Sequence, residues 1–195
     1  MHNQVYKKLL PLLFLLILFS SILTAQEVVH KANSRDREPL KQMPRLESLT
    51  LEKEKVILPV HCKGRICLLA MEFSRNAQDT LKAWIEHYRE AFKGDQRYDY
   101  FQMPMLSGFG VGLFYRLIIN GIRKKVDRNE RNHYLVAISG VKRFRKTMGW
   151  DKKIKTRILL LDRNGHIRWQ SFGEPVKGKL EALLRTCRML ATESR

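Results

Sequence analysis

The sequence predicts an α/β domain, and three patterns support this prediction. Residues 66–73 and 157–161 are almost continuously apolar, which is typical of central strands that are covered on both faces. Between them, apolar residues recur at helical spacing: Ala77, Leu81, Trp84, Ile85 and Tyr88. Asn164-Gly165 then supplies the positive φ that a tight hairpin turn needs before a partner strand over residues 166–170.

The other elements follow from local signals. Residues 56–60 read as a strand that precedes a turn at Lys63-Gly64, and residues 98–103 alternate as a strand that Pro104 ends. Residues 108–122 form a helix with an unusually wide apolar face, because polar interruptions are few. A short extended piece over residues 132–136 and helices over residues 141–148 and 179–190 complete the set.

The predicted order is therefore β-β-α-β-α-α-β-β-α. This is the order of a thioredoxin-like domain, a central sheet flanked by helices, with one additional N-terminal strand.

The N-terminal segment, residues 1–25, predicts an export signal. Lys7 and Lys8 precede an apolar stretch from Leu9 to Phe19, and Ala25 provides a small residue for cleavage. A retained membrane anchor is the alternative, although the stretch is shorter than the roughly 20 apolar residues of a spanning helix. Residues 26–54 are polar and rich in alternating charge, which predicts a linker, so the thioredoxin-like domain is expected to cover residues 55–195.

Charge is the strongest compositional feature. The chain of 195 residues has 37 Lys and Arg against 19 Asp and Glu, a net charge of +18. The stretch from Arg116 to Arg157, with both arginines counted, contains fourteen basic and three acidic residues. It begins within the predicted apolar helix. A helix with an apolar face flanked by cations is typical of proteins that bind to the surface of an anionic membrane. The aromatic residues expected at that interface are Phe109, Phe114 and Tyr115. A solvated charged face is the alternative.

Thiol chemistry at the usual thioredoxin-like position is not expected. Such an enzyme carries its reactive Cys where the helix after the central strand begins, because the helix N-terminus lowers the thiol pKa. Here that position is Ser74–Gln78, which contains no Cys, and Thr156 stands where a cis-Pro normally shapes the site. Of the three cysteines, Cys67 and Cys187 are expected to be core residues and Cys62 a strand-end residue, with a Cys62–Cys67 disulfide as the alternative.

No metal site or cofactor is expected. The six histidines show no i, i+4 pair of the kind that a helical metal site needs. No Gly-rich phosphate loop with its downstream elements and no nucleic-acid-binding motif is present, and an export signal disfavours nucleic acid as the partner.

Three stretches resemble the mitochondrial ATP synthase assembly factor ten family. Residues 65–84 are similar to its apolar strand, polar loop and Trp-bearing helix. Residues 113–134 are similar to its apolar-then-basic helix that leads to Asn132-His133-Tyr134, and residues 159–169 are similar to its strand, Asp turn and Ile167-Arg168-Trp169 ending. The presequence departs from a transit peptide, since it has two lysines and no arginine, and this favours a bacterial exported relative.

The resemblance implies a non-enzymatic, chaperone-like factor that assists assembly of the membrane part of the rotary ATP synthase. We expect the protein in the periplasm, either free or anchored in the membrane with its domain facing the periplasm. In a eukaryote, we expect it at the mitochondrial inner membrane. Its expected partners are anionic lipid and a membrane-protein client, an ATP synthase subunit by the resemblance. The residues expected to bind these partners are Phe114, Arg123, Lys124, Lys125, His133, Tyr134, Arg168 and Trp169. The alternative function is a divergent thiol or peroxide reductase that uses Cys62 and Cys67.

Overall fold

The computed structural model describes residues 41–107, 111–151 and 153–193, which belong to one compact unit. The predicted signal at residues 1–25, the first part of the predicted linker and Phe109 lie outside the described residues.

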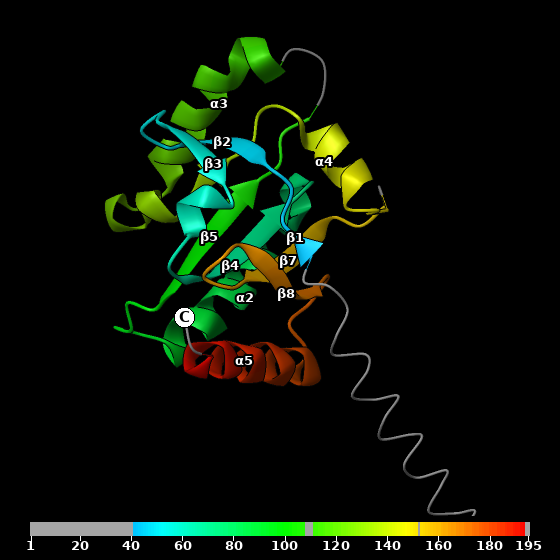
Figure 1. Ribbon diagram of the computed structural model, residues 1–195. Coiled ribbons are helices and arrows are strands. Elements are labelled where there is room, and N and C mark those ends of the chain that lie inside the picture. Colours follow the sequence, from blue (N-terminus) through cyan, green and yellow to red (C-terminus); the bar gives the residue numbers. More distant parts are fainter. Residues whose placement is uncertain (1–40, 108–110, 152, 194–195) are drawn as a thin grey trace, which may run out of the picture. The chain divides into compact units, whose positions relative to one another are not determined.

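A five-stranded sheet forms the centre of this unit (Figure 1), in the order β1-β8-β7-β4-β5. Its strands are β1 (Lys41–Gln42), β4 (Ile66–Glu72), β5 (Tyr98–Pro104), β7 (Thr156–Leu161) and β8 (His166–Ser171). β4 runs parallel to β5 and antiparallel to β7, and β8 returns antiparallel to β7. All seven residues of β4 are buried, as the continuous apolar pattern predicts for a central strand.

Two helices cover one face of this sheet: α2 (Gln78–Ala91) and α5 (Lys177–Thr192) (Figure 1). Leu81, Trp84 and Tyr88 of α2 pack with Leu183 and Cys187 of α5 against alternate residues of β4 and β7. The Trp84 indole N–H donates to the Gly173 carbonyl at 2.8 Å, so the polar group of this large buried side chain has a hydrogen-bond partner.

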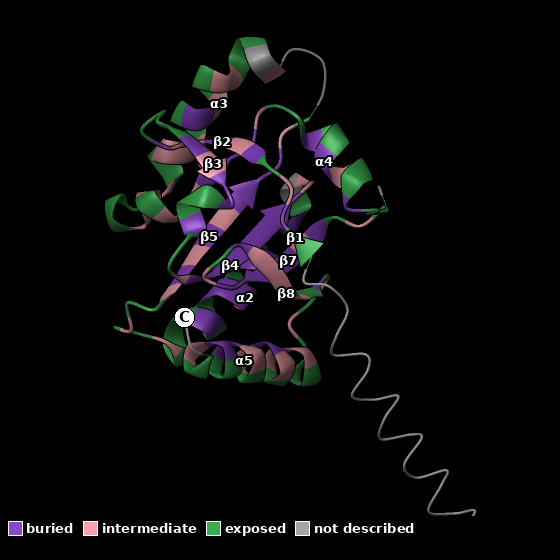
Figure 2. Cartoon of the chain, viewed as in Figure 1, coloured by how far each residue is buried: buried purple, intermediate pink, exposed green. Residues whose placement is uncertain are grey.

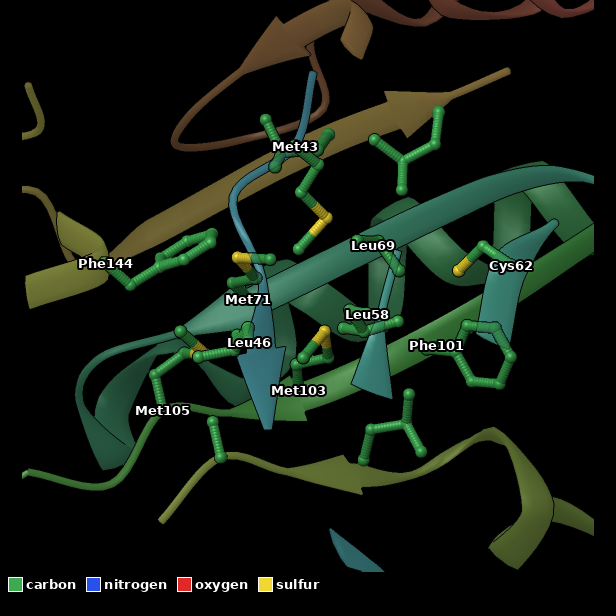
Figure 3. Close-up of a cluster of buried hydrophobic side chains, with 14 of the residues drawn as sticks. Met43, Leu46, Leu58, Cys62, Leu69, Met71, Phe101, Met103, Met105 and Phe144 are labelled. Atoms are coloured by element: carbon green, nitrogen blue, oxygen red, sulfur yellow. The ribbon is translucent and has the colours of Figure 1, made fainter. Parts of the chain in front are cut away.

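A second, three-stranded sheet covers the opposite face, in the order β3-β2-β6. It consists of β2 (Leu46–Thr50), β3 (Lys55–Leu58) and β6 (Leu135–Val136), and the helix α4 (Val141–Thr147) packs beside it. Figure 3 shows how Leu69 and Met71 of β4 and Phe101 and Met103 of β5 meet side chains from this layer in a core of Leu, Met and aromatic residues.

The helix α3 (Val111–Lys125) lies over the small sheet rather than over the main one (Figure 1). Ile119 is fully buried there, with Leu51 and Val136. The short 3-10 helix η3 (Arg128–His133) then returns the chain to β5, through parallel bridges from Tyr134 to Gln102 and from Ala137 to Met105.

The structure corrects one predicted boundary. Residues 41–54 were predicted to belong to a polar linker, but they form β1 and β2, and Met43, Leu46 and Leu51 are buried. The folded unit therefore begins before Lys55. The predicted hairpin turn is confirmed: Gly165 has a φ of 85°, and the Asp162 carboxylate accepts bonds from the N–H groups of Asn164 and His166, both at 2.9 Å.

Candidate functional site

The N-terminal part of α3 exposes large apolar side chains. Leu113 is 78%, Phe114 53% and Leu117 69% exposed, whereas Ile119 on the inner side is 0% exposed. We call Leu113, Phe114 and Leu117 the apolar face of α3. In Figure 2, most of α3 is coloured as exposed or intermediate. The helix therefore has two apolar sides, and only one of them is used in folding. Tyr115, expected at the interface, is instead half-buried against the small sheet.

Cations gather at the other end of the same helix. Arg123, Lys124 and Lys125 form its last turn, where the carbonyl end of the helix dipole favours positive charge. Arg123 forms an ion pair with Glu52 at 2.6 Å, while Lys124 and Lys125 are exposed. The Arg131 side chain donates to the carbonyls of Arg123 and Val126 at 3.0 and 3.3 Å, which satisfies acceptors that a helix end leaves open.

The two features meet in an open pocket of about 570 Å³. Its lining combines one residue of the apolar face with three cationic side chains: Leu117, Asn120, Gly121, Arg123, Lys124 and Arg131. Such a lining can hold an anionic group next to an apolar chain. The pocket therefore brings Arg123 and Lys124 next to Leu117 of the apolar face, whereas Phe114 and Lys125 are exposed on the same helix outside the pocket lining.

His133 lies in a different setting, at the outer edge of the main sheet. Its Nδ1 is 3.4 Å from the Asp99 carboxylate and 3.1 Å from the Tyr100 carbonyl, and its ring stacks on the Tyr100 ring at 4.1 Å. The hydrogen bond to Asp99 is the main reason why the pKa of His133 is raised.

This His133 contact is part of a longer polar network. Asp99 also binds Arg65, and the Tyr100 hydroxyl donates to Glu130 at 2.8 Å. Glu130 in turn pairs with Arg89 at 3.0 Å. The network links α2, β5 and η3, so it fixes the position of η3 against the sheet.

The four residues predicted as a partner surface do not form one. Tyr134 is half-buried beside the α3 cluster, next to His133. Arg168 and Trp169 belong to β8, which β7 and β4 separate from β5. Arg168 binds Asp162 at 3.3 Å and Glu193 at 2.6 Å, and Trp169 packs on Trp84 with ring centroids 5.8 Å apart. These contacts tie the C-terminal end of α5 and the helix α2 to the hairpin.

Cys62 and Cys67 are both free thiols in the core. The Cys67 Sγ lies 3.6 Å from the Cys62 carbonyl, and the hydrogen bond with Cys62 together with burial raises the pKa of Cys67 well above its usual range. Burial also raises the pKa of Cys187 to about 12. A high pKa keeps a thiol protonated, and the protonated thiol is a poor nucleophile.

The sequence reasoning overlooked a buried carboxyl group. Glu72 ends β4 and is only 7% exposed, and its Oε2 has no hydrogen-bond partner among the described residues. Burial raises the pKa of Glu72 to about 7, and a hydrogen bond with the Gln78 side chain lowers it by less. The signal in the sequence was a single acidic residue at the end of an otherwise apolar strand.

In the part of the chain that the structure describes, no three His, Cys, Asp or Glu side chains lie close enough to hold a metal ion. None of the described helices has the length and apolarity that a membrane crossing requires.

Solved structures with a similar fold are thioredoxin-like proteins. The exposed lipoprotein thioredoxin Etrx1 of Streptococcus pneumoniae has a TM-score of 0.51 at 15% identity, over 73% of this chain and 98% of that one. A thiol:disulfide interchange protein of the thioredoxin family from Chlorobium tepidum has a TM-score of 0.51 at 9% identity, over 78% and 97% of the two chains. A thiol-disulfide oxidoreductase of Bacteroides fragilis has a TM-score of 0.50 at 17% identity, over 73% and 99%. The predicted thioredoxin-like fold is therefore confirmed.

No curated protein matches the chain. A family model described as ATP10 protein matches residues 37–190, and this match includes β1 and β2. The three stretches that resemble the assembly factor family lie within it. Because the match spans well over half of the chain, the chain belongs to the ATP10 family of ATP synthase assembly factors.

Proposed function

We propose that this protein is an exported, membrane-associated factor that helps to assemble the membrane part of the rotary ATP synthase, and that it does so without thiol chemistry. The client is a membrane-protein subunit of the synthase. The protein acts at the periplasmic side of a bacterial membrane, or at the mitochondrial inner membrane in a eukaryote. Family membership supports the assembly role, and the signal-like residues 1–25 support the location.

The observation that carries the membrane part of this proposal is the outer surface of α3. Leu113, Phe114 and Leu117 are exposed in its first two turns, and three cations follow in its last turn. These exposed apolar side chains do not serve to hold the helix in the fold, because Ile119 and its neighbours already anchor it to the small sheet. On a membrane, the apolar face enters the interface while the cations meet anionic headgroups.

The proposal that the domain is redox-inactive rests on two observations. The segment that leads into the first residue of α2, Ser74–Gln78, contains no Cys, so the fold's usual reactive position has no thiol. Cys62 and Cys67 are buried, and the pKa of Cys67 is raised rather than lowered. Reactive thiols need the opposite environment, partly exposed and electropositive.

Vesicle binding tests the membrane part. In the full chain, replacing Arg123, Lys124 and Lys125 together by Gln should weaken binding to phosphatidylglycerol-containing vesicles by on the order of 100-fold at low salt. Each cation near an anionic surface contributes about 1 kcal/mol, and about 1.4 kcal/mol is tenfold in affinity. Co-sedimentation with vesicles of stated composition measures this change.

The matched control removes three exposed cations elsewhere: Lys93→Gln, Arg185→Gln and Arg188→Gln, the last two on α5. This control should bind the anionic vesicles nearly as well as the unaltered chain. Equal loss in both variants, or equal binding of the unaltered chain to pure phosphatidylcholine vesicles, would contradict docking through α3.

A further inference from the structure

Two arginines and three aromatic rings form a cluster that the proposed function leaves unused. The Arg157 guanidinium, on β7, lies between the rings of Trp150 and Phe172, at 5.1 and 5.2 Å from their centroids. The Arg145 guanidinium, on α4, lies 4.3 Å from the Phe73 ring. We call these five residues the arginine–aromatic cluster.

Each of the two guanidiniums has a buried Nε–H without an acceptor among the described residues. The Nε atoms of Arg157 and Arg145 are buried, and neither has a hydrogen-bond partner among the described residues. Arg145 makes one side-chain bond, to the Asp151 carbonyl at 2.7 Å. A buried N–H without an acceptor destabilises a fold, which is why native proteins rarely retain one without a role.

The positive charge of the cluster is compensated only in part. Burial lowers the pKa of Arg157, and the like charge of Arg145 lowers it further, while Asp151 opposes this only in part. Lys179 adds a third cation, since its Nζ is 5.3 Å from the Phe172 ring and donates to the Phe172 carbonyl at 2.7 Å. Because guanidiniums stay protonated in proteins, an anion is the ligand that this environment favours.

The cluster also lies where this type of fold binds ligands. Phe73 directly follows β4, and its N–H donates to the Lys155 carbonyl just before β7. Open α/β sheets bind ligands outside the carboxyl ends of their parallel strands, and Phe73 stands at that end of β4. None of the five residues belongs to α3.

We propose that the arginine–aromatic cluster binds an acidic segment of a protein partner, with a carboxylate of that segment held by Arg157 and Arg145. Arginine forks bind carboxylates through two parallel hydrogen bonds. Phe172 is 50% exposed beside Arg157, so an apolar side chain next to the carboxylate has a surface to cover. A peptide presents both groups together, whereas a free phosphate presents only charge. The inference goes beyond the proposed function, which assigns lipid to α3.

Fluorescence anisotropy of the full chain tests it. The probe is a short fluorescein-labelled peptide in which two glutamates flank a leucine, and the reference probe has glutamines in their place. The glutamate probe should bind, and Arg157→Gln and Arg145→Gln should each weaken its binding at least tenfold, about 1.4 kcal/mol. Arg157→Lys should also lose binding, because an ammonium does not reproduce the stacked, two-pronged contact.

Lys142→Gln is the matched control, since it removes one exposed positive charge from the same helix as Arg145. It should change the affinity less than about twofold, as expected for a charge that makes no direct contact. Failure of the glutamate probe to bind, equal losses in Lys142→Gln and the arginine variants, or full binding by Arg157→Lys would overturn the proposal. Displacement of the probe by inorganic phosphate more readily than by free glutamate would overturn the carboxylate assignment. Vesicle binding through α3 is measured separately, so the two proposals fail independently.

Discussion

At the scale of single residues, Glu72 gives the stability of this domain a defined pH dependence. Its folded-state pKa is about 7, above the ordinary 4.5. Between these pH values the folded protein holds a proton that the unfolded chain has released. The free energy of unfolding therefore falls as the pH rises from about 4.5 to about 7, and it stays lower above that range.

Glu72→Gln keeps the shape of the protonated side chain and cannot ionise. We expect this variant to lose the decline and to exceed the unaltered chain above about pH 7 by about 3 kcal/mol at most. Urea unfolding between about pH 5 and about pH 8 measures the difference. Glu86→Gln, an exposed position on α2, should leave the decline in place. Parallel pH profiles for Glu72→Gln and the unaltered chain would show that Glu72 does not titrate in this way.

At the scale of elements, α3 has one buried apolar side and one exposed apolar side. Ile119→Ala should lower the free energy of unfolding by about 2–4 kcal/mol, since Ile119 is fully buried with Leu51 and Val136. Leu117→Ala removes a side chain of similar size that is 69% exposed, and it should change stability by about 0.5 kcal/mol or less. Urea unfolding of both variants makes the comparison. Equal losses would mean that the apolar face of α3 is part of the core.

The elements also show how far sequence reasoning reaches. β4 and β7 were predictable because strands buried on both faces are continuously apolar. β2 was not, because it sits between two clusters: Leu46 points into the core of the main sheet, and Leu49 packs beside α3. The leucines of this short strand pack into two different clusters, and charged and hydroxyl residues lie between them. The sequence therefore shows no clear alternation of apolar and polar residues, and it resembles a linker.

The candidate site was predictable only in part, for a similar reason. The sequence shows an apolar segment from Leu113 that ends in a basic block at Lys125, but not that Leu117 faces outward and Ile119 inward. Arg145 and Arg157 were visible only as members of a long basic run. The two arginines lie in one arginine–aromatic cluster only because the fold brings α4 and β7 together. A local sequence pattern does not show such a long-range contact.

At the scale of the whole described unit, a thioredoxin-like sheet carries an added layer. The small sheet and α3 cover the face opposite α2 and α5, and they bring the basic stretch after residue 116 to the outside of the fold. In this arrangement the reactive-thiol position of the fold is without a Cys, and the surfaces that remain for function are cationic and apolar. We therefore propose that the domain functions through these surfaces rather than through sulfur chemistry.

The most direct test is the amount of assembled ATP synthase in native-gel assays of cells that lack this gene and carry a variant of it. A chain with Ser at Cys62, Cys67 and Cys187 should restore assembly, after its folding is verified. The chain with Gln at Arg123, Lys124 and Lys125 should fail to do so, while the control with Gln at Lys93, Arg185 and Arg188 should succeed. Normal assembly without the gene, or loss of assembly in the folded Ser variant, would contradict the account.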